Sequence, residues 1–286
     1  MASKLTLDGG IALVTGAASG IGKETAFAFA EAGAQGVVFA DLNDEGGKAV
    51  AEESQKYAKH TKFRALAIKV DIANAESVGR LVSSTVKEFG RVDYAVHCAG
   101  IEMENYGSFT PALDLDVFSK ISDTNITGAV LFVRAVMGAM AQQEPLTLPG
   151  TSRHGPRSLG RGSIVLLGST SSLLGSPGMI SYTTAKHAII GIMRSAAVDA
   201  LALQSAIRVN AVCPAWVDTR MVRDAVETNS MLKHAIDNIT PFKRAASVDE
   251  VADYIVFLSS PSASFINGTA LPIDAGLSLP APSFLQ

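Results

Sequence analysis

I-A-L-V-T-G-A-A-S-G-I-G, from Ile11 to Gly22, reads as a short apolar strand that runs directly into a glycine-rich turn. A helical pattern follows from about Lys23 to Glu31. A strand, a glycine turn and a helix in this order can bind phosphate, because glycines let backbone N–H groups approach a ligand and a helix N-terminus favours negative charge. The spacing is G-x-x-x-G-x-G. Tight turns use glycine everywhere, so this stretch needs support from the rest of the chain.

The rest of the chain continues the alternation of strands and helices. The pattern predicts strands at 37–40, 64–70, 92–97, 163–168, 207–212 and 269–273, and helices at 44–58, 74–89, 114–142, 180–203 and 247–259. Such alternation requires a parallel sheet covered on both faces. We therefore predict an α/β, doubly wound, Rossmann-like fold, and expect residues 1–286 to form a single domain.

Composition narrows the class of protein. The formal net charge of −3 gives no basic excess, so no nucleic-acid partner is expected. No apolar run approaches the ~18 residues that span a bilayer, and the first residues lack the apolar core of a signal peptide. The two cysteines, Cys98 and Cys213, lie in apolar stretches, as buried thiols in a reducing compartment do. We expect a cytoplasmic enzyme with no membrane partner and no metal.

Asp41 ends the second strand, roughly 20 residues after the glycine turn. A carboxylate there can accept hydrogen bonds from both ribose hydroxyls of NAD and would repel the 2′-phosphate of NADP. None of Ala17, Ala18, Leu42 and Asn43 supplies a cation for that phosphate. The position favours NAD as the cofactor. The alternative is that Asp41 only caps the following helix.

A second stretch, Ser169 to Lys186, carries three groups suited to proton transfer. Tyr182 and Lys186 are four residues apart, which puts both on one helix face. The Gly/Pro-rich turn between Ser169 and that helix lets all three converge. The pKa of a free phenol is about 10, and an ammonium group about 4 Å away favours the phenolate by roughly 4 kcal/mol. We expect Lys186 to lower the pKa of Tyr182 and make it a proton acceptor. A chance Tyr-x-x-x-Lys match is the alternative.

Three further segments raise expectations about the surface. Residues 141–161, rich in Pro, Gly and Arg, predict a solvated loop that contacts another subunit or a partner. Residues 216–243 have a loose pattern with scattered apolar side chains, as a mobile lid would show. Helix 180–203 is apolar nearly all round. Its apolar surface is too wide to be covered by one sheet face, which indicates a homo-oligomer.

Taken in order, these motifs resemble the short-chain dehydrogenase/reductase family over nearly the whole chain. The matching segments are T-G-A-A-S-G-I-G at 15–22, Asp71, A-G at 99–100, N-I-T-G at 125–128, Ser169, Y-T-T-A-K at 182–186, P-A-W-V-D-T at 214–219, D-E-V-A at 249–252 and N-G-T-A-L-P-I-D-A-G at 267–276. The resemblance implies a seven-stranded sheet, a nicotinamide cofactor and a tetramer. The chain departs from the family where His97 and Cys98 replace two asparagines and Ala215 replaces a glycine.

The resemblance also implies residue roles. Tyr182 is the general acid/base, Lys186 lowers its pKa and holds the nicotinamide ribose, Ser169 bonds the reacting oxygen, and the Asn125 carbonyl holds a water that relays protons to Lys186. Val217 and Thr219 grip the carboxamide, while Asp71 bonds the adenine amino group or caps a helix. The expected cofactor-binding positions are Gly16, Ser19, Gly20, Ile21, Gly22, Asp41, Asp71, Ile72, Cys98, Ala99, Gly100, Tyr182, Lys186, Val217 and Thr219.

These observations predict an NAD-dependent oxidoreductase that moves a hydride between nicotinamide and a secondary alcohol or ketone. The expected substrate side holds Ser169, Tyr182, Met179 and Trp216, with Ile101, Met103, Tyr106, Leu173, Leu174 and Met221 nearby. Their apolar character favours a bulky apolar substrate, unless they only pack the lid. Glu102 and Glu104 disfavour an anionic substrate, although both can face solvent. Three alternatives remain: an NADPH-dependent carbonyl reductase, a non-redox isomerase or cyclase, and a cofactor-sensing scaffold.

Overall fold

A computed structural model describes residues 7, 9–104, 109–148, 155–228 and 230–279 of the chain. Within them, seven parallel strands form one sheet in the order β3-β2-β1-β4-β7-β8-β9. The strands are β1 (Ile11–Thr15), β2 (Gly36–Asp41), β3 (Arg64–Lys69), β4 (Tyr94–His97), β7 (Gly162–Leu167), β8 (Ile207–Pro214) and β9 (Ala270–Ile273). The prediction of a doubly wound parallel sheet is confirmed.

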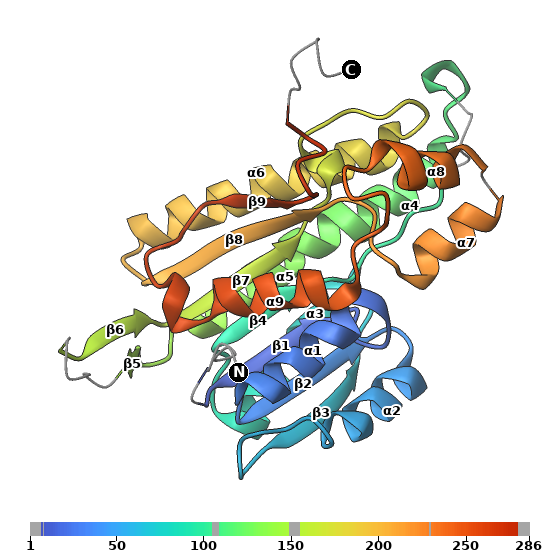
Figure 1. Ribbon diagram of the computed structural model, residues 1–286. Coiled ribbons are helices and arrows are strands. Elements are labelled where there is room, and N and C mark those ends of the chain that lie inside the picture. Colours follow the sequence, from blue (N-terminus) through green and yellow to red (C-terminus); the bar gives the residue numbers. More distant parts are fainter. Residues whose placement is uncertain (1–6, 8, 105–108, 149–154, 229, 280–286) are drawn as a thin grey trace.

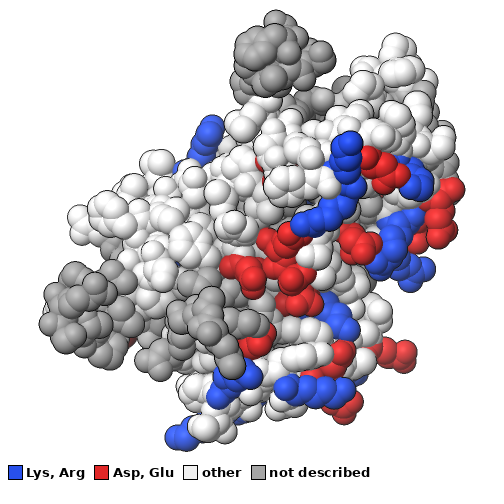
Figure 2. All heavy atoms as spheres, in the orientation of Figure 1, with Lys and Arg blue, Asp and Glu red and all other residues white. Residues whose placement is uncertain are grey.

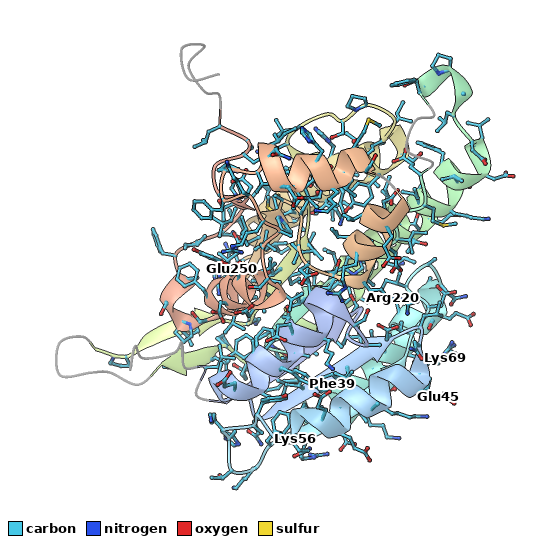
Figure 3. The ribbon with its side chains drawn as sticks, turned by 45° about the vertical axis from the view of Figure 1, so that its right-hand side comes forward. Phe39, Glu45, Lys56, Lys69, Arg220 and Glu250 are labelled. Atoms are coloured by element: carbon cyan, nitrogen blue, oxygen red, sulfur yellow. The ribbon has the colours of Figure 1, made fainter. Side chains whose placement is uncertain are left out.

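Helices cover both faces of this sheet (Figure 1). On one face lie α1 (Gly20–Ala32), α2 (Asp44–Ser54) and α9 (Val248–Ser259), whose apolar side chains share a core with Val14, Phe39 and Val212. On the other lie α3 (Ala75–Phe89), α5 (Gly128–Met140) and α6 (Ile180–Ala202), packed against Leu13 and Val209. Phe39, on the middle of β2, is fully buried between sheet and helices (Figure 3). The strands are near-continuous apolar runs because both sheet faces are covered.

The region expected as one helix over 114–142 has a wider turn in its middle. It consists of α4 (Leu115–Ile121), a π-helix (Ser122–Thr127) and α5, with Asn125 buried inside the π segment. The π-helix is rare and occurs most often as a single turn at functional sites. A period-3.6 apolar pattern does not reveal such a turn, because residues on both sides of it keep the same spacing toward the core.

The loop prediction for 141–161 is partly wrong. Residues Leu146–Leu148 (β5) and Arg157–Gly160 (β6) pair as an antiparallel hairpin, which projects from the end of the molecule opposite α7 and α8 (Figure 1). Its intervening residues 149–154 lie outside the described part of the chain. The Pro, Gly and Arg content masked the two strands, because at three and four residues they are too short to show an alternation pattern.

The loosely patterned segment 216–243 is mostly helical. It contains α7 (Arg220–Thr228), α8 (Ser230–His234) and a second π-helix (Ala235–Ile239), with large apolar side chains such as Met231 and Phe242 exposed. Short 3₁₀ turns occupy Thr110–Ala112, Thr170–Ser172 and Pro261–Ala263. No helix in the described part of the chain combines the length and apolar character needed to cross a membrane.

The molecular surface mixes charges of both signs. On the face shown in Figure 2, acidic side chains gather beside lysines and arginines. Glu24 on α1 lies near two carboxylates of α9; burial, followed by the charges of Asp249 and Asp253, raises the pKa of Glu24. On this face, nothing resembles the basic stripe that a nucleic-acid backbone requires.

Candidate active site

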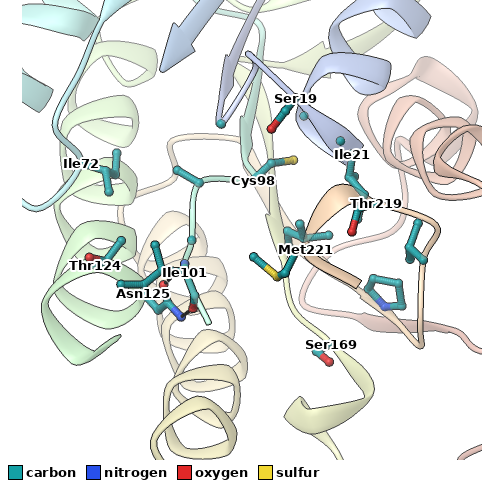
Figure 4. Close-up of a pocket in the computed structure, with 18 of the residues that line it drawn as sticks. Ser19, Ile21, Ile72, Cys98, Ile101, Thr124, Asn125, Ser169, Thr219 and Met221 are labelled. Carbon is teal, nitrogen blue, oxygen red and sulfur yellow. Dashed lines mark hydrogen bonds between the residues drawn. The ribbon is translucent and has the colours of Figure 1, made fainter. Parts of the chain in front are cut away.

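A cavity of about 460 Å³ opens at the carboxyl ends of the strands. It lies where the strand order reverses between β1 and β4, the place where open parallel sheets bind ligands. Its walls include every position expected to contact the cofactor, together with Asn125 and Ser169. Figure 4 shows Ser19 and Ile21 at one end, Asn125 and Ser169 at the other, and Cys98 between them.

The glycine turn lets the backbone pack closely at the first end. Gly16 has φ +66°, and a Cβ there would lie 2.9 Å from the backbone nitrogen of Ala99. A Cβ on Gly22 would lie 2.2 Å from the Gly16 carbonyl oxygen. Ser19, the N-cap residue of α1, is extended and makes no side-chain capping bond, so the helix N-terminus faces the cavity. This arrangement suits a pyrophosphate group.

Asp41 holds the edge of the glycine turn instead of capping α2. Its Oδ2 accepts from the Ala18 N–H at 2.9 Å and its Oδ1 from the Asn43 N–H at 2.9 Å. The cap of α2 is Asn43, whose side chain accepts from Gly46 at 3.1 Å. The carboxylate therefore stays at the cavity wall, where it can accept further bonds from a ribose.

Asp71 is likewise not the cap of the helix that follows it. Its Oδ1 accepts from the Ala73 N–H at 3.0 Å, while Asn74 caps α3 through the Ser77 N–H at 2.9 Å. Asp71 and Ile72 line the cavity beside Val70.

Two cations escaped the sequence argument about Asp41. Lys69 is its register partner on β3, and Arg220, at the start of α7, lines the same cavity (Figure 3). Arg220 lies 3.4 Å from Asp224 on its own helix, and both side chains are exposed. Only the strand pairing brings Lys69 beside Asp41, so spacing along the chain gave no signal for it.

The reacting end gathers Ser169, Tyr182 and Lys186. Ser169 begins a 3₁₀ turn after β7, and its Oγ accepts from the Ser171 N–H at 3.1 Å. Tyr182 and Lys186 lie on the first turns of α6, with the Lys186 Nζ 5.5 Å from the centre of the Tyr182 ring. The Lys186 Nζ donates to the Leu167 carbonyl at 2.8 Å, which anchors α6 to the end of β7.

The electrostatics of this pair differ from the expected depression of the Tyr182 pKa. Burial raises the pKa of Tyr182 to about 12, a hydrogen bond with Ser169 acts to lower it, and the Glu102 carboxylate raises it further. Burial also lowers the pKa of Lys186 to about 8. The sequence argument counted the attraction between the Lys186 ammonium and the Tyr182 phenolate. It underestimated the cost of removing water from the phenolate, and that cost is the larger of the two here. Tyr182 is therefore held as the neutral phenol.

Asn125 joins the π-helix to the segment that follows β4. Its side-chain Oδ1 accepts from the Ile101 N–H at 2.9 Å and its Nδ2 donates to the Ile101 carbonyl at 2.8 Å (Figure 4). A Cβ on Gly100 would lie 3.2 Å from the same Oδ1. The Asn125 side chain thus fixes the chain just beyond Gly100, while the backbone at Asn125 has the widened geometry of a π turn.

His97 and Cys98 stand where the family commonly has two asparagines, and neither side chain carries a charge. The Thr15 hydroxyl bonds His97 Nδ1 at 3.0 Å and accepts from the Ala99 N–H at 3.2 Å. His97 stacks on Phe132 at 5.1 Å, and burial lowers the pKa of its imidazole to about 3. Burial raises the pKa of the Cys98 thiol to about 12. Both groups are neutral at physiological pH.

The expected substrate side is only partly assembled around the cavity. Ile101 and Met221 line it, whereas Met179 is the N-cap residue of α6, Trp216 is half-buried outside the lining, and Met103, Leu173 and Leu174 are exposed. Tyr106 lies outside the described residues. Lining residues that the motifs did not indicate are Leu42, Val70, Thr124, Leu167, Gly168, Arg220 and Val222. Most of these residues are adjacent to a motif residue in the sequence, and that adjacency is the signal that could have indicated them.

Known proteins match this architecture. The family model described as enoyl-(acyl carrier protein) reductase matches residues 16–278. A short-chain dehydrogenase of Neurospora crassa, srdC, is 41% identical over 95% of this chain and 98% of its own. The (+)-cis,cis-nepetalactol synthase NEPS3 of Nepeta racemosa is 32% identical over 96% of this chain and 93% of its own. Levodione reductase superimposes with a TM-score of 0.81 at 27% identity, covering 96% of this chain and 100% of that one.

The glycine turn, the cavity at the strand switch point and the matches over most of the chain agree with one another. The chain belongs to the short-chain dehydrogenase/reductase family of nicotinamide-dependent oxidoreductases.

Proposed function

We propose that the protein is an NAD-dependent alcohol dehydrogenase or carbonyl reductase acting on a bulky apolar secondary alcohol or its ketone. The observation that carries the proposal is the convergence of Asn125, Ser169, Tyr182 and Lys186 on one cavity whose other end is the glycine turn. The residues fit a dinucleotide, because Gly16 and Gly22 leave no room for a Cβ and Asp41 offers carboxylate oxygens beside them. Bound there, the nicotinamide would supply or accept the hydride.

In this proposal Tyr182 handles the proton. In the reducing direction, the neutral phenol donates its proton to the substrate oxygen as that oxygen gains charge, and oxidation reverses the transfer. Ser169 donates a hydrogen bond to the same oxygen. Lys186 stabilises the phenolate left behind, and its low pKa of about 8 lets it pass protons onward. The raised pKa of Tyr182 supports the donor role, since burial keeps the proton on the phenol until substrate arrives.

A substrate screen tests this activity. Purified protein is incubated with NAD and a panel of secondary alcohols, or with NADH and the matching ketones, and absorbance of the reduced nicotinamide is followed. Substrate-dependent turnover that Tyr182→Phe abolishes is expected. The apolar lining by Ile101, Met221 and Val222 favours large apolar members of the panel over sugars. Turnover that survives Tyr182→Phe would contradict the proposal.

The choice of NAD rests on Asp41. A 2′-phosphate would meet its carboxylate, while Lys69 lies on the neighbouring strand and Arg220 on α7. These two cations are the observation that favours NADPH as the alternative cofactor. Fluorescence titration of the reduced cofactors decides between them, and equal affinity for both would remove the NAD assignment.

A non-redox synthase is the second candidate function. It is favoured by the 32% identity to the nepetalactol synthase of Nepeta racemosa over nearly all of both chains. A synthase would form product with no net change in reduced nicotinamide, so mass spectrometry of products beside the absorbance assay separates the two. A cofactor-sensing scaffold would need neither Ser169 nor Tyr182, and both are kept at the cavity wall.

We also propose that residues 216–243 act as a lid and that the protein is a homotetramer in the cytoplasm. Thr219 to Val222 line the cavity from the start of the lid. Val198, Leu201 and Leu203 at the end of α6 are exposed, which supports burial against another copy. Cys98 and Cys213 are free thiols, as in a reducing compartment. Light scattering, limited proteolysis with and without NAD, and cell fractionation test the three statements.

A further inference from the structure

Helix α6, which carries Tyr182 and Lys186, begins without a cap of its own. Its N-cap residue is Met179, which makes no side-chain capping bond, and its first turn contains no acidic residue. The first N–H groups of a helix have no partner within the helix and need an acceptor. In α6 the second and third helical positions are Ser181 and Tyr182, whose N–H groups a capping side chain normally bonds.

Glu104 provides that acceptor from a different part of the chain. The Ser181 N–H donates to its Oε1 at 2.7 Å and the Tyr182 N–H donates to its Oε2 at 3.1 Å. The carboxylate lies half-buried against the positive end of the α6 dipole, which strengthens both bonds. The two residues are 77 and 78 positions away from Glu104, so the contact is tertiary. The sequence left open that Glu104 faces solvent. In the structure its carboxylate instead bonds the start of α6.

The segment 101–104, called the strap here, is held at both of its ends. The Glu104 N–H donates to the Glu102 carboxylate at 2.6 Å. At the other end, the Asn125 side chain holds both backbone groups of Ile101, at 2.9 and 2.8 Å. The strap thus connects the buried Asn125 of the π-helix to the backbone of Tyr182. Hydrogen bonds at Ile101 and at Glu104 therefore link the two sides of the cavity through the strap.

We propose that Glu104 is a positioning residue that fixes the first turn of α6 through the strap, and so sets the phenol of Tyr182 against Ser169 and the substrate. The inference rests on the proposed function for its effect on turnover. The phenol oxygen lies at the far end of a long side chain, so a small tilt of the first helical turn displaces it. A misplacement of about 1 Å in a reacting group can cost about 10²-fold in rate.

The test uses Glu104→Gln and Glu104→Ala, with Glu76→Gln as the matched control. Gln keeps the reach of Glu104 but offers one acceptor oxygen in place of two, whereas Ala removes both bonds. Glu76 is also a glutamate in the first turn of a helix, α3, and its side chain is 87% exposed. The control therefore loses the same charge at a helix start outside the cavity lining.

Three readouts are expected to move together. Hydrogen exchange of Ser181 and Tyr182 speeds up in Glu104→Gln and more in Glu104→Ala. In the same order kcat falls, by roughly 10- to 100-fold for Ala, while the Kd for NAD stays within about twofold. The ring signals of Tyr182, followed by NMR of ring-labelled tyrosine and assigned with Tyr182→Phe, change position in Glu104→Ala, because the hydrogen bond with Ser169 is weakened. Glu76→Gln changes none of them.

The outcomes separate the inference from the proposed function. Faster exchange with unchanged kcat and unchanged Tyr182 ring signals would make Glu104 a structural cap only and would overturn the inference. Unchanged exchange at Ser181 and Tyr182 would overturn it as well. If the unmodified protein turned over no alcohol or ketone, the proposed function would fail, yet exchange and the Tyr182 ring signals would still decide the role of Glu104. Should Glu104→Ala fail to fold, Glu104→Gln gives the same readouts at smaller amplitude.

Discussion

The two ends of the cavity are built in different ways. At the dinucleotide end, the Ala18 N–H of the glycine turn donates to the Asp41 carboxylate, and close backbone contacts exclude a Cβ at Gly16 and Gly22. At the reacting end, Tyr182 depends on side chains from three separate segments: Ser169, Lys186 and the strap that carries Glu104. Damage at the first end should weaken binding, whereas damage at the second should slow chemistry with binding preserved.

The difference reflects what each end has to do. Phosphates and ribose are bound by fixed N–H groups and a carboxylate, which a short local motif can place. Proton transfer needs a group whose proton affinity is tuned, and tuning comes from burial and from charges brought together by the fold. The five substitutions below break one end at a time, from the largest expected effect to the smallest.

Replacing Tyr182 with Phe should give the largest loss. Without the phenol, kcat should fall by at least about 10³-fold, within the usual range for a general acid or base. The Kd for NAD should change by less than about twofold, since the ring remains. Steady-state kinetics and fluorescence titration measure the two quantities. A comparable loss of NAD binding would mean that the two ends are not separable.

Ser169→Ala should lower kcat by about 10²-fold, the usual effect of losing one hydrogen-bond donor to a developing oxyanion. The Ser169 Oγ also accepts from the Ser171 N–H at 3.1 Å, so some local loosening is expected. Ser83→Ala, at an exposed serine on α3, serves as the control. A change confined to KM would indicate that Ser169 only binds substrate.

Gly22→Ala should weaken NAD binding by roughly 10- to 100-fold, since the new methyl would push the turn away from the pyrophosphate and cost charged hydrogen bonds. The reason is the 2.2 Å separation between that Cβ and the Gly16 carbonyl oxygen. Gly79→Ala is the matched control, because a Cβ there meets nothing within 4 Å in the same kind of helix. Isothermal calorimetry provides both affinities, and equal affinities would show that the turn tolerates expansion.

Asp41→Ala should reduce the preference for NAD over NADP by at least about tenfold, because the like charge facing a 2′-phosphate is removed. Lys69 and Arg220 remain nearby, so the variant should bind NADP measurably. Adding Lys69→Ala to Asp41→Ala should return part of the lost preference. Competitive titration with both cofactors measures the ratio. An unchanged ratio in Asp41→Ala would place cofactor selection elsewhere.

Glu102→Gln should have the smallest effect. The Glu102 carboxylate raises the pKa of Tyr182, so removing its charge should lower that pKa and move the rise of the oxidation rate to lower pH. Gln still offers an oxygen to the Glu104 N–H, which keeps the strap in place. The pH–rate profile measures the shift. A shift to higher pH would mean that the substitution displaced the strap instead of changing the charge.

Local motifs predicted most of the residues that line the dinucleotide end of the cavity, and Ser169, Tyr182 and Lys186 at the other end. The glycine turn, Asp41 and the Tyr182–Lys186 spacing are readable because each is contained in a few consecutive residues, and all of them line one cavity. The resemblance to the family added Asn125, which residue patterns alone treated as an ordinary helical asparagine. Its bonds to Ile101, 24 positions away, give the buried side-chain amide its hydrogen-bond partners.

Properties that depend on distant segments could not be read in this way. Glu104 looked like a surface charge, because nothing near it in sequence indicates the N-terminus of α6. The raised pKa of Tyr182 was missed since the sequence gives the spacing of Lys186 but not the extent of burial. The pairing of β5 with β6 depends on two strands of three and four residues, too short for an alternation pattern.

The π-helix at Ser122–Thr127 has a consequence for the angular phase of the helices on either side. An α-helix advances by about 100° per residue, and a π turn advances by less because it holds more residues. Even so, the buried residues Ile121, Asn125, Phe132 and Val136 keep the spacing of a regular helix along the chain. The wider turn therefore changes the course of the backbone at Asn125 and not which side chains make up the inward-facing side of the helix.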